Sequence, residues 1–412
     1  MRILWLSNIT LPELSIHLGQ KAYFGGGWLS SLAKEIKNYV SLGIVSVAES
    51  ERKVELNDIT YYQVKSINSN SWGKILEDFK PDIIHLHGTE YPYSLTAAEN
   101  SGKTPIVVSI QGLVSIYSRF ALGGLTSKEI ISNLTLKDIL KNSSPWAIQQ
   151  SQKERGERER KLISKTKYIA GRTSWDKSHA VAINPNVKYF VCGEILRDSF
   201  YNGKWEYKKA TPFTIFCCNS SVPLKGTHQI IKALPLIKKR FPNVTLRIAG
   251  KNVVGKLSMK ERLKLSGYDN YLRNLISKLG LSDNITFLGH LNEEEMKREF
   301  LNCNVFVLGS SIENSPNSLG EAQLLGVPVI ASYVGGTCDM MPDGLQDYLY
   351  RFEEIEMLSN KVCQIFEASQ SWSHIQEFEI TTASQRHSKE KVREQTLEMY
   401  KEIISRENKE TI

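Results

Sequence analysis

Short runs of apolar residues alternate with longer segments of mixed polarity along most of the chain. Runs such as residues 82–86 and 105–110 are almost continuously apolar, which is typical of parallel strands buried on both faces. Segments such as residues 28–39 repeat their apolar positions at helical spacing. This alternation predicts a doubly wound α/β fold.

The first half of the chain predicts one parallel sheet with helices on its faces. The expected strands are residues 2–7, 43–47, 59–64, 82–86, 105–110, 168–170 and 187–191, and the expected helices include 28–39 and 174–182. A long excursion, residues 123–151, interrupts this set between two strands. Insertions of this length often serve a function.

A second set of strands and helices follows residues 201–211, a polar stretch without periodicity that we interpret as a linker. Its expected strands are 213–218, 244–249, 285–288, 305–308 and 328–331, and its expected helices are 227–240, a region within 260–279, 293–301 and 316–325. We therefore predict two Rossmann-like domains, 1–200 and 201–388, facing a ligand-binding cleft. Residues 389–412 form a predicted terminal helix that docks back toward the first domain.

The composition supports this picture and narrows the cellular setting. The chain has 412 residues, of which 41% are hydrophobic and 23% charged, as expected for a globular protein of about two domains. No apolar run reaches the roughly 7–15 residues of a signal peptide or the about 20 of a membrane helix. The six cysteines include no CxxC pair and no zinc-type spacing with histidine. We therefore expect a cytoplasmic protein.

Positive charge is in mild excess, since 52 Lys and Arg residues face 44 Asp and Glu residues and give a formal charge of +8. Such an excess suits phosphate-bearing ligands or an anionic membrane face. The chain shows no basic motif interleaved with aromatic residues, so nucleic acid is not an expected partner.

The window with the most chemical information follows the expected strand 305–308. Ser315 and Pro316 fit the N-cap and the first position of a helix. The N–H groups of Asn317, Ser318 and Leu319 would then form an anion site of phosphate size, aided by the helix dipole.

Two carboxylates flank this predicted anion site. Glu313 precedes the cap, and Glu321 lies one helical turn past Asn317. Taken alone, each glutamate is more simply explained as a solvated surface residue. The cap, the spacing and the preceding buried strand together favour a site.

Glu313 and Glu321 are separated by seven residues and followed by Gly326-Val327-Pro328. This arrangement resembles the EX7E motif of retaining GT-B glycosyltransferases of family 4 (glycosyl transferases group 1), which include sucrose-phosphate synthases and bacterial polysaccharide and lipid glycosyltransferases. Further matches occur in family order at Leu224-Lys225-Gly226, Ala249-Gly250, Phe287-Leu288-Gly289, Gly335-Gly336-Thr337, Gly25-Gly26-Gly27 and residues 81–87. The resemblance is strong over 213–344 and weaker over 1–200.

The resemblance implies roles that the residue chemistry also supports. Glu313 would lie near the reacting face of the donor hexose, and Glu321 would accept hydrogen bonds from the ribose hydroxyls. Lys225 would offset the charge on the departing diphosphate, which is the main electrostatic demand of the reaction. The remaining donor-binding residues implied are Gly26, Gly27, Asn219, Gly250, Asn317, Ser318 and Leu319.

The chain departs from the family pattern before Lys225. Family members often carry an arginine five or six residues earlier, where this chain has Ser220 and Asn219. Lys225 would then handle more of the phosphate charge, or another cation would replace the arginine. The candidates for that replacement are Arg2, Lys251 and Arg172.

A second departure concerns the expected sugar contact. Many members carry a histidine after the strand that corresponds to residues 105–110, where this chain has Gln111. Glutamine can bind a sugar hydroxyl but does not titrate near neutral pH. His87, at the end of an adjacent strand, is the second candidate, and a structural hydrogen bond explains it equally well.

We therefore expect a retaining glycosyltransferase that moves a hexose from a UDP- or GDP-linked donor to a hydroxyl of a saccharide or lipid-linked acceptor. Bacterial capsule or lipopolysaccharide assembly is the expected setting, by analogy. No cofactor beyond the nucleotide sugar and no metal are expected. The alternatives are a GT-B nucleotide-sugar epimerase, which the EX7E context disfavours, and a two-lobed sugar-binding protein, which the lack of an export signal disfavours.

A contact with an anionic membrane is also predicted, on the cytoplasmic side. Residues 153–177 hold nine basic against four acidic residues, beside apolar side chains of the excursion. An apolar strip next to a basic stretch is what an interfacial helix requires, although a solvated helix face is the simpler alternative. The apolar residues are Ile130, Ile131, Leu134, Leu136, Ile139, Leu140 and Trp146.

Overall fold

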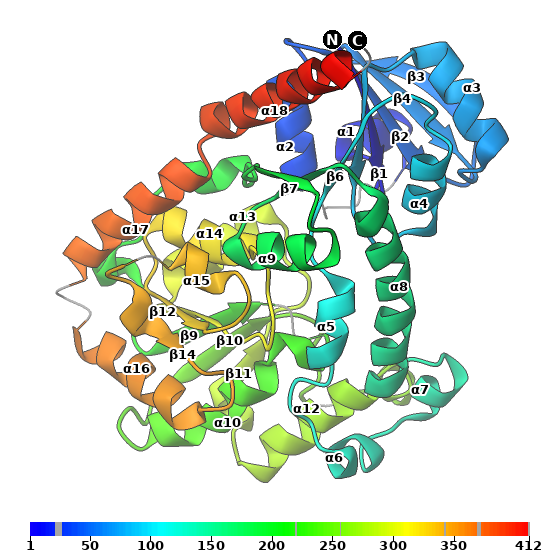
Figure 1. Ribbon diagram of the computed structural model, residues 1–412. Helices are drawn as coiled ribbons and strands as arrows, with labels where there is room; N and C mark the ends of the chain where they lie inside the picture. Colours follow the sequence, from blue (N-terminus) through cyan, green and yellow to red (C-terminus); the bar gives the residue numbers. More distant parts are fainter. Residues whose placement is uncertain (21–26, 219–220, 256, 342, 369–371, 411–412) are drawn as a thin grey trace. The chain divides into compact units, whose positions relative to one another are not determined.

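The computed structural model describes residues 1–20, 27–218, 221–255, 257–341, 343–368 and 372–410 (Figure 1). The chain divides into two compact units. Unit 1 comprises Met1–Ser115, Glu154–Arg197 and Gln385–Ile412, and unit 2 comprises Ile116–Lys153 and Asp198–Ser384. The predicted division into 1–200 and 201–388 therefore differs from the structure in one large respect, since residues 116–153 join unit 2.

Unit 1 is built on an eight-stranded sheet of order β3-β4-β2-β1-β5-β6-β7-β8. The neighbouring strands pair in parallel except β3 and β4, which form an antiparallel edge. The strands are β1 (Arg2–Ser7), β2 (Ser41–Val47), β3 (Arg52–Leu56), β4 (Ile59–Val64), β5 (Ile83–His87), β6 (Ile106–Ser109), β7 (Tyr168–Gly171) and β8 (Lys188–Val191).

The helices of unit 1 include a terminal helix that packs on its first half. They are α1 (Pro12–His17), α2 (Gly27–Ile36), α3 (Ser69–Phe79), α4 (Pro92–Glu99), α9 (Ser174–Ile183) and α18 (Lys389–Glu410), while α5 (Val114–Phe120) and α8 (Pro145–Lys165) cross the unit boundary. Helix α18 lies against α2. The Trp5 Nε1 group donates to the Tyr400 hydroxyl at 2.9 Å, and this hydroxyl lies 2.6 Å from His85 Nδ1.

Unit 2 is built on a parallel sheet of order β11-β10-β9-β12-β13-β14. Its strands are β9 (Thr214–Cys218), β10 (Thr245–Ala249), β11 (Ile285–Phe287), β12 (Val305–Leu308), β13 (Val329–Ser332) and β14 (Leu349–Tyr350). The chain runs outward from β9 to β11 and then crosses to β12 on the other side of β9. The order therefore reverses between β9 and β12, where parallel sheets form their ligand-binding crevice.

The helices of unit 2 include two short ones from the excursion. They are α6 (Ser127–Ile131), α7 (Leu136–Leu140), α10 (Thr227–Lys238), α11 (Met259–Arg262), α12 (Gly267–Lys278), α13 (Glu293–Asn302), α14 (Asn317–Leu325), α15 (Thr337–Met340), α16 (Ile355–Ala368) and α17 (Ser373–Arg386). The Tyr271 hydroxyl on α12 donates to Glu129 on α6 at 2.9 Å, and Asn274 Nδ2 donates to Asn133 Oδ1 at 2.8 Å. These contacts explain why residues 116–153 belong to unit 2.

The segment predicted as a linker, residues 201–211, is instead a packed part of unit 2. Trp205 is buried, its N–H donates to the Leu325 carbonyl at 2.8 Å, and its Nε1 donates to the Cys303 carbonyl at 2.7 Å. Most other residues of this segment are exposed, so it shows no periodicity although Trp205 anchors it.

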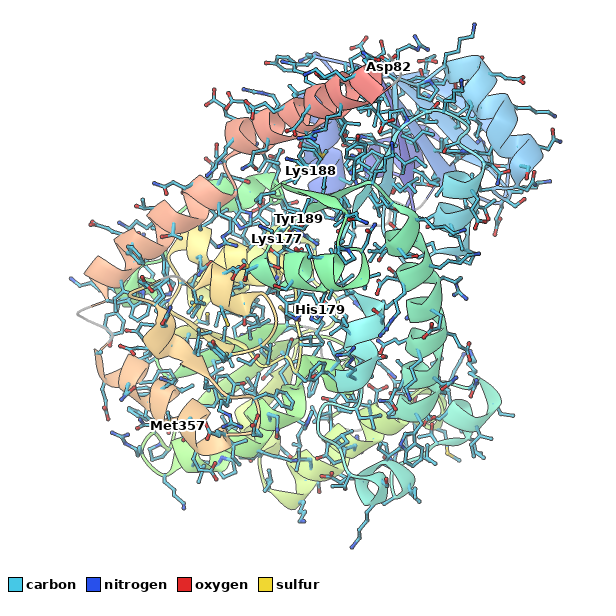
Figure 2. The ribbon with its side chains drawn as sticks, viewed as in Figure 1. Asp82, Lys177, His179, Lys188, Tyr189 and Met357 are labelled. Carbon is cyan, nitrogen blue, oxygen red and sulfur yellow. The ribbon has the colours of Figure 1, made fainter. Side chains whose placement is uncertain are left out.

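The basic and apolar parts of the predicted membrane-binding segment are divided between the two units. From Glu154 onward the basic segment belongs to unit 1, whereas residues 116–153 belong to unit 2. Many of its cations have partners within unit 1: Lys161 and Lys165 pair with Glu99, Arg155 with Glu90, Lys167 with Glu407 and Arg172 with Glu194, and Lys177 lies 5.9 Å from the centre of the Tyr189 ring (Figure 2). These contacts leave fewer cations of the segment for a membrane. None of the helices within the described residues has the length and apolar character of a membrane span.

The Tyr400 hydroxyl is predicted to hold α18 on unit 1. Burial lowers the pKa of His85 to about 3, so the ring is neutral and bonds Tyr400 and Ser109 through its two nitrogens. Tyr400→Phe would leave buried polar groups of Trp5 and His85 without this partner, at a cost of about 1–3 kcal/mol in the free energy of unfolding. Urea denaturation measures this loss, with the exposed Tyr39→Phe as the control. Equal stabilities of the two variants would contradict the prediction.

Candidate functional site

Lys225 and Glu313 meet at the switch point of the unit 2 sheet. Lys225 ends the short 3-10 helix η3 (Pro223–Lys225) that follows β9, and Glu313 follows β12. The Lys225 Nζ donates to Glu313 Oε1 at 2.6 Å, and the Ser310 hydroxyl donates to the same oxygen at 2.7 Å. The Glu313 side chain is 7% exposed and that of Lys225 is 26% exposed. A cation is thus fixed where parallel sheets bind ligands.

The ion pair keeps Lys225 charged. Burial alone would lower the pKa of Lys225, but the charge of Glu313 and the hydrogen bond to it raise this pKa above its ordinary value. A protonated ammonium has three donors, so it can hold Glu313 and still bind an anionic ligand.

Two glycines shape the backbone around this pair. Gly226 has φ +66°, and a Cβ there would lie 1.6 Å from the Gly309 carbonyl oxygen. Gly335 has φ +51°, and its Cβ would lie 1.9 Å from the Glu313 carbonyl oxygen, which also accepts the Gly336 N–H at 3.0 Å. Only glycine combines this backbone region with so close an approach.

Helix α14 begins one residue later than predicted. Pro316 is the N-cap, no side chain caps the helix, and the Ser315 hydroxyl lies 3.7 Å from the Met340 sulfur instead. The Leu319 N–H donates to the Pro316 carbonyl at 3.0 Å, so it is engaged within the first turn. Of the three predicted N–H donors, Asn317 and Ser318 occupy the first two helical positions, where an α-helix has no internal acceptors for them.

The second glutamate, Glu321, is buried in α14 rather than solvated. Its charge and that of Glu313 raise the pKa of Cys218, which ends β9. Burial contributes most to this shift, a Ser318 hydrogen bond and the Lys225 charge oppose it, and the pKa of Cys218 is about 11. The Cys218 thiol therefore lies among both glutamates, Lys225 and the start of α14.

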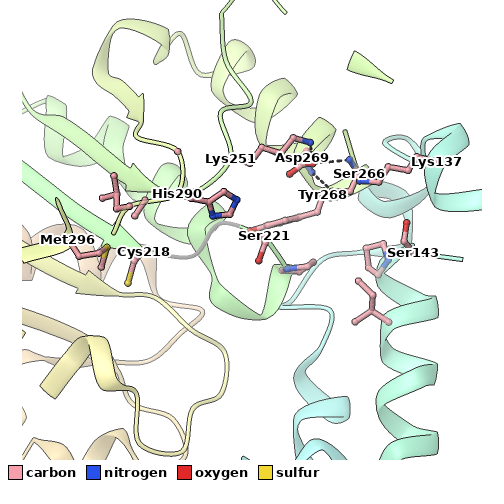
Figure 3. A pocket seen from close by; sticks show the side chains of 17 residues that line it. Lys137, Ser143, Cys218, Ser221, Lys251, Ser266, Tyr268, Asp269, His290 and Met296 are labelled. Atoms are coloured by element: carbon pink, nitrogen blue, oxygen red, sulfur yellow. Dashed lines mark hydrogen bonds and ion pairs between the residues drawn. The ribbon is translucent and has the colours of Figure 1, made fainter. Parts of the chain in front are cut away.

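Cys218 also lines a pocket of about 590 Å³ in unit 2 (Figure 3). The carboxyl ends of β9 and β10, the turn after β11 and the start of α12 form its walls. The residues from these elements are Cys218, Ser221, Ala249, Gly250, Lys251, Ser266, Tyr268, Asp269, Gly289, His290 and Leu291. The predicted donor residue Gly250 thus lines the pocket, and the pocket reaches the surroundings of the ion pair through Cys218.

The excursion completes the wall of this pocket. Its residues Lys137, Ser143, Pro145 and Ile148 face the same space. His228 ties the excursion to the pocket, because its Nδ1 lies 2.9 Å from the Tyr268 hydroxyl and its Nε2 lies 2.9 Å from the Gly123 carbonyl. Burial lowers the pKa of His228 to about 3, so this bridge is uncharged at neutral pH.

Of the three cations considered as replacements for the missing arginine, Lys251 lies at the pocket. Its Nζ donates to Asp269 at 3.0 Å (Figure 3). The same Nζ donates to the Lys264 carbonyl at 2.9 Å. Arg172 is buried with Glu194 and donates to two carbonyls of unit 1, and the Arg2 guanidinium lies over the Phe79 ring. Those two side chains are engaged in structural contacts.

The residues predicted in the first domain lie within unit 1. His87 and Gln111 line a cavity of about 30 Å³, and neither ring nitrogen of His87 has a hydrogen-bond partner among the described residues. Burial, and then the adjacent His85 ring, hold the pKa of His87 well below its usual value. The Gln111 carbonyl accepts from Arg172 at 2.6 Å. Gly27 is the first residue of α2.

Two predicted donor-binding residues, Gly26 and Asn219, lie outside the described residues. The sequence analysis missed Ser310, Tyr268, Asp269 and His290, which contact Glu313 or line the pocket. His290 could have been found from its place directly after Gly289, the glycine that closely follows β11, whereas Tyr268 and Asp269 carry no comparable signal. Within the described ranges no group of three or more His, Cys, Asp or Glu side chains is arranged to hold a metal ion.

Solved structures share this fold over nearly the whole chain. Anabaena HepE in complex with UDP has a TM-score of 0.68 and 17% identity, covering 98% of this chain and 100% of that one. Sucrose-phosphate synthase from Thermosynechococcus elongatus has a TM-score of 0.70 and 12% identity, covering 98% and 99%. These likenesses define the fold as GT-B, with two Rossmann-like units built on parallel sheets.

Family comparisons agree with this fold. Residues 202–379 match the family model "Glycosyl transferases group 1", and residues 27–139 match "Glycosyl transferase 4-like". The D-inositol 3-phosphate glycosyltransferase of Arthrobacter sp. (strain FB24) is 32% identical over 121 residues, which is 29% of this chain and 26% of that relative. The chain thus matches about a quarter of that relative's length. The chain is therefore similar to the group 1 glycosyltransferases over residues 202–379, and it has the GT-B fold over nearly its whole length.

The fit of Gly335 against the Glu313 loop generates a stability prediction. Gly335→Ala places a methyl group against the Glu313 carbonyl in a left-handed backbone, so we expect a loss of about 2–5 kcal/mol in the free energy of unfolding. Gly280→Ala is the matched control, because Gly280 has φ +65° and nothing within 4 Å of its added Cβ. The control should lose only about 1–2 kcal/mol. Equal losses in urea denaturation would show that the Glu313 loop has room for the methyl group.

Proposed function

We propose that this protein is a retaining glycosyltransferase that moves a hexose from a nucleotide sugar to an acceptor hydroxyl. The observation that carries this proposal is the Lys225–Glu313 pair at the switch point of unit 2, close to a pocket of nucleotide size. The match of residues 202–379 to the model of the group 1 glycosyltransferases supports the same activity.

The donor would occupy the pocket and the start of α14. We assign the nucleotide base to the pocket among Gly250, Lys251 and His290, and the diphosphate to Lys225 and the first N–H groups of α14. The Oδ1 atom of Asn317 is buried without a hydrogen-bond partner among the described residues, which suits a donor group of the ligand. Glu321 would accept from the ribose hydroxyls.

In the proposed reaction the bond between the anomeric carbon and the phosphate oxygen breaks while the acceptor oxygen bonds the same face of that carbon. The departing phosphate oxygen takes the acceptor proton. Glu313 would orient the hexose and stabilise positive charge at the anomeric carbon, and Lys225 would stabilise the negative charge on the diphosphate. The reaction as proposed uses no metal ion, because Lys225 and the α14 N-terminus supply the positive charge.

A UDP- or GDP-linked hexose is the proposed donor. Anabaena HepE, which shares the fold, has been crystallised with UDP, with UDP and glucose, and with UDP-glucose. A saccharide or a lipid-linked molecule is the proposed acceptor, in bacterial surface polysaccharide assembly at the inner face of the cell membrane. The sugar contacts predicted for His87 and Gln111 and the diphosphate contact predicted for Gly27 belong to this proposal.

Removal of the Lys225 charge should slow the reaction more than it weakens the fold. We expect Lys225→Ala to lower turnover at least about a hundredfold, as for the loss of one transition-state charge stabiliser. Lys278→Ala, an exposed lysine on α12, is the control. Assays run in EDTA should show the same difference in turnover between Lys225→Ala and Lys278→Ala. If EDTA abolishes the activity of the wild type and Mg²⁺ or Mn²⁺ restores it, the proposed phosphate contacts are wrong. Thermal melting of each variant checks its folding.

Removal of Glu321 should weaken donor binding. Two hydrogen bonds to a charged acceptor are worth roughly 1.5–3 kcal/mol each, so Glu321→Ala should raise the dissociation constant at least about a hundredfold. Thermal stabilisation by a panel of UDP-, GDP-, ADP- and TDP-sugars first identifies the donor, because a ligand of the folded state raises its stability. Glu294→Ala, an exposed carboxylate on α13, is the control. Unchanged affinity in Glu321→Ala would remove this residue from the site.

A further inference from the structure

Large apolar side chains are exposed on two short helices of the excursion and on a neighbouring helix. Figure 1 shows α6 and α7 beside α12, on the surface of unit 2. The Leu140 side chain is 83% exposed and that of Met259, on α11, is 81% exposed. We name as the apolar tip the exposed residues Ile131, Leu134, Leu136, Ile139, Leu140, Met259 and Leu263.

Two acidic residues of α6 and α7 are instead engaged within unit 2. Asp138 is 2% exposed and Glu129 accepts the Tyr271 hydroxyl. Each acid also closes a capping box, Glu129 with Thr126 and Asp138 with Thr135. Helices that only cover a domain turn their apolar side chains inward and their charges outward. Here most of the large apolar side chains of the two helices are exposed instead, and such a group marks an interaction surface.

Hydrogen bonds bring α7 and the end of α11 side by side. Lys137 Nζ donates to the Lys264 carbonyl at 2.9 Å, and the Thr135 hydroxyl donates to the Leu265 carbonyl at 3.2 Å. The exposed apolar residues of the two helices therefore belong to one region of unit 2.

This region is bordered by positive charge. The exposed cations on or next to the three helices are Lys128, Lys141, Lys260, Arg262 and Lys264. Of the acids in the same segments, Glu129 and Asp138 are engaged in their capping boxes, and Glu261 caps α11 through Ser258. Hydrogen bonds to Thr126 and Tyr271 more than offset the effect of burial and lower the pKa of Glu129 to about 2.

From this combination we infer that the apolar tip docks on an anionic lipid surface. Apolar side chains enter the boundary between headgroups and acyl chains, while lysines and arginines around them attract anionic headgroups. A second copy of the same chain fits less well, because two identical tips would bring like charges together.

The inference refines the membrane contact in the proposed function and moves it from the basic segment 153–177 to unit 2. Lys137, on the same helix as three residues of the tip, also lines the 590 Å³ pocket. Docking through the tip would therefore hold that pocket close to the lipid surface. A lipid-linked acceptor would then reach a donor bound in this pocket. Binding of the tip to lipid does not itself require sugar transfer.

Vesicle flotation of the full chain, without nucleotide, tests the inference. The probes are vesicles of phosphatidylcholine alone and of phosphatidylcholine mixed with phosphatidylglycerol, each at low and high salt. We expect flotation with the mixed vesicles that weakens as salt rises. Ile139→Ser/Leu140→Ser should lower the partition coefficient at least about tenfold, because two inserting side chains are lost. Ile16→Ser, an exposed isoleucine on α1, is the matched control and should bind like the wild type.

The outcomes separate this inference from the proposed activity. Wild-type protein that stays in the soluble fraction with mixed vesicles at low salt would overturn it, whatever the transferase assay shows. Equal flotation of Ile139→Ser/Leu140→Ser and wild type would also overturn it. Sedimentation equilibrium tests whether the tip binds a second copy of the chain instead. If the wild type is a multimer and Ile139→Ser/Leu140→Ser is a monomer, the tip is an interface between copies and the lipid inference is wrong. Circular dichroism of the variants confirms their folding.

Discussion

The ion pair between Lys225 and Glu313 joins the two strands at which the unit 2 sheet reverses its order. Gly226 directly follows Lys225, and Gly335 faces the Glu313 carbonyl from the loop after β13. Glycine is required at both positions because the facing backbone leaves no room for a Cβ. The pair holds a permanent cation in a largely buried position. The proposed chemistry depends on it, since the cation would face the diphosphate while its partner carboxylate would face the sugar.

The segment 116–153, which contains the excursion 123–151, gives unit 2 features that its sheet alone does not provide. It closes one wall of the 590 Å³ pocket and is tied to the sheet side through the neutral His228 bridge. On its outer side it exposes the apolar tip. One inserted segment thus contributes both to the proposed donor site and to the inferred lipid surface.

Periodicity predicted most of the elements because buried parallel strands and amphipathic helices have strong local patterns. Strands β1, β4 and β12 have the predicted bounds. Strand β3 was missed because its charged, half-exposed residues carry no apolar run, and two-residue β14 is too short for any pattern. Residues 116–153 belong to unit 2 because of tertiary contacts such as the hydrogen bond between Tyr271 and Glu129. No local sequence pattern predicts such contacts.

For the site, the sequence predicted that chemistry would gather around Glu313 and Lys225, and it missed how the two are held. The spacing of the glutamates and the Lys-Gly turn are local features. The burial of Glu313 and Glu321 and the ion pair with Lys225 depend on tertiary packing. The predicted Ser315 cap failed because its hydroxyl is directed to Met340, a contact set by the fold rather than by the helix.

We propose that this site cleaves the bond between a hexose and a nucleoside diphosphate and forms the new bond on the same face of the sugar. NMR of acceptor-free hydrolysis tests this proposal most directly, with the nucleotide sugar that stabilises the protein best as the substrate. We expect slow release of nucleoside diphosphate together with free hexose that first appears in the anomeric configuration of the donor. Binding without cleavage, or hexose that first appears in the opposite configuration, would contradict it.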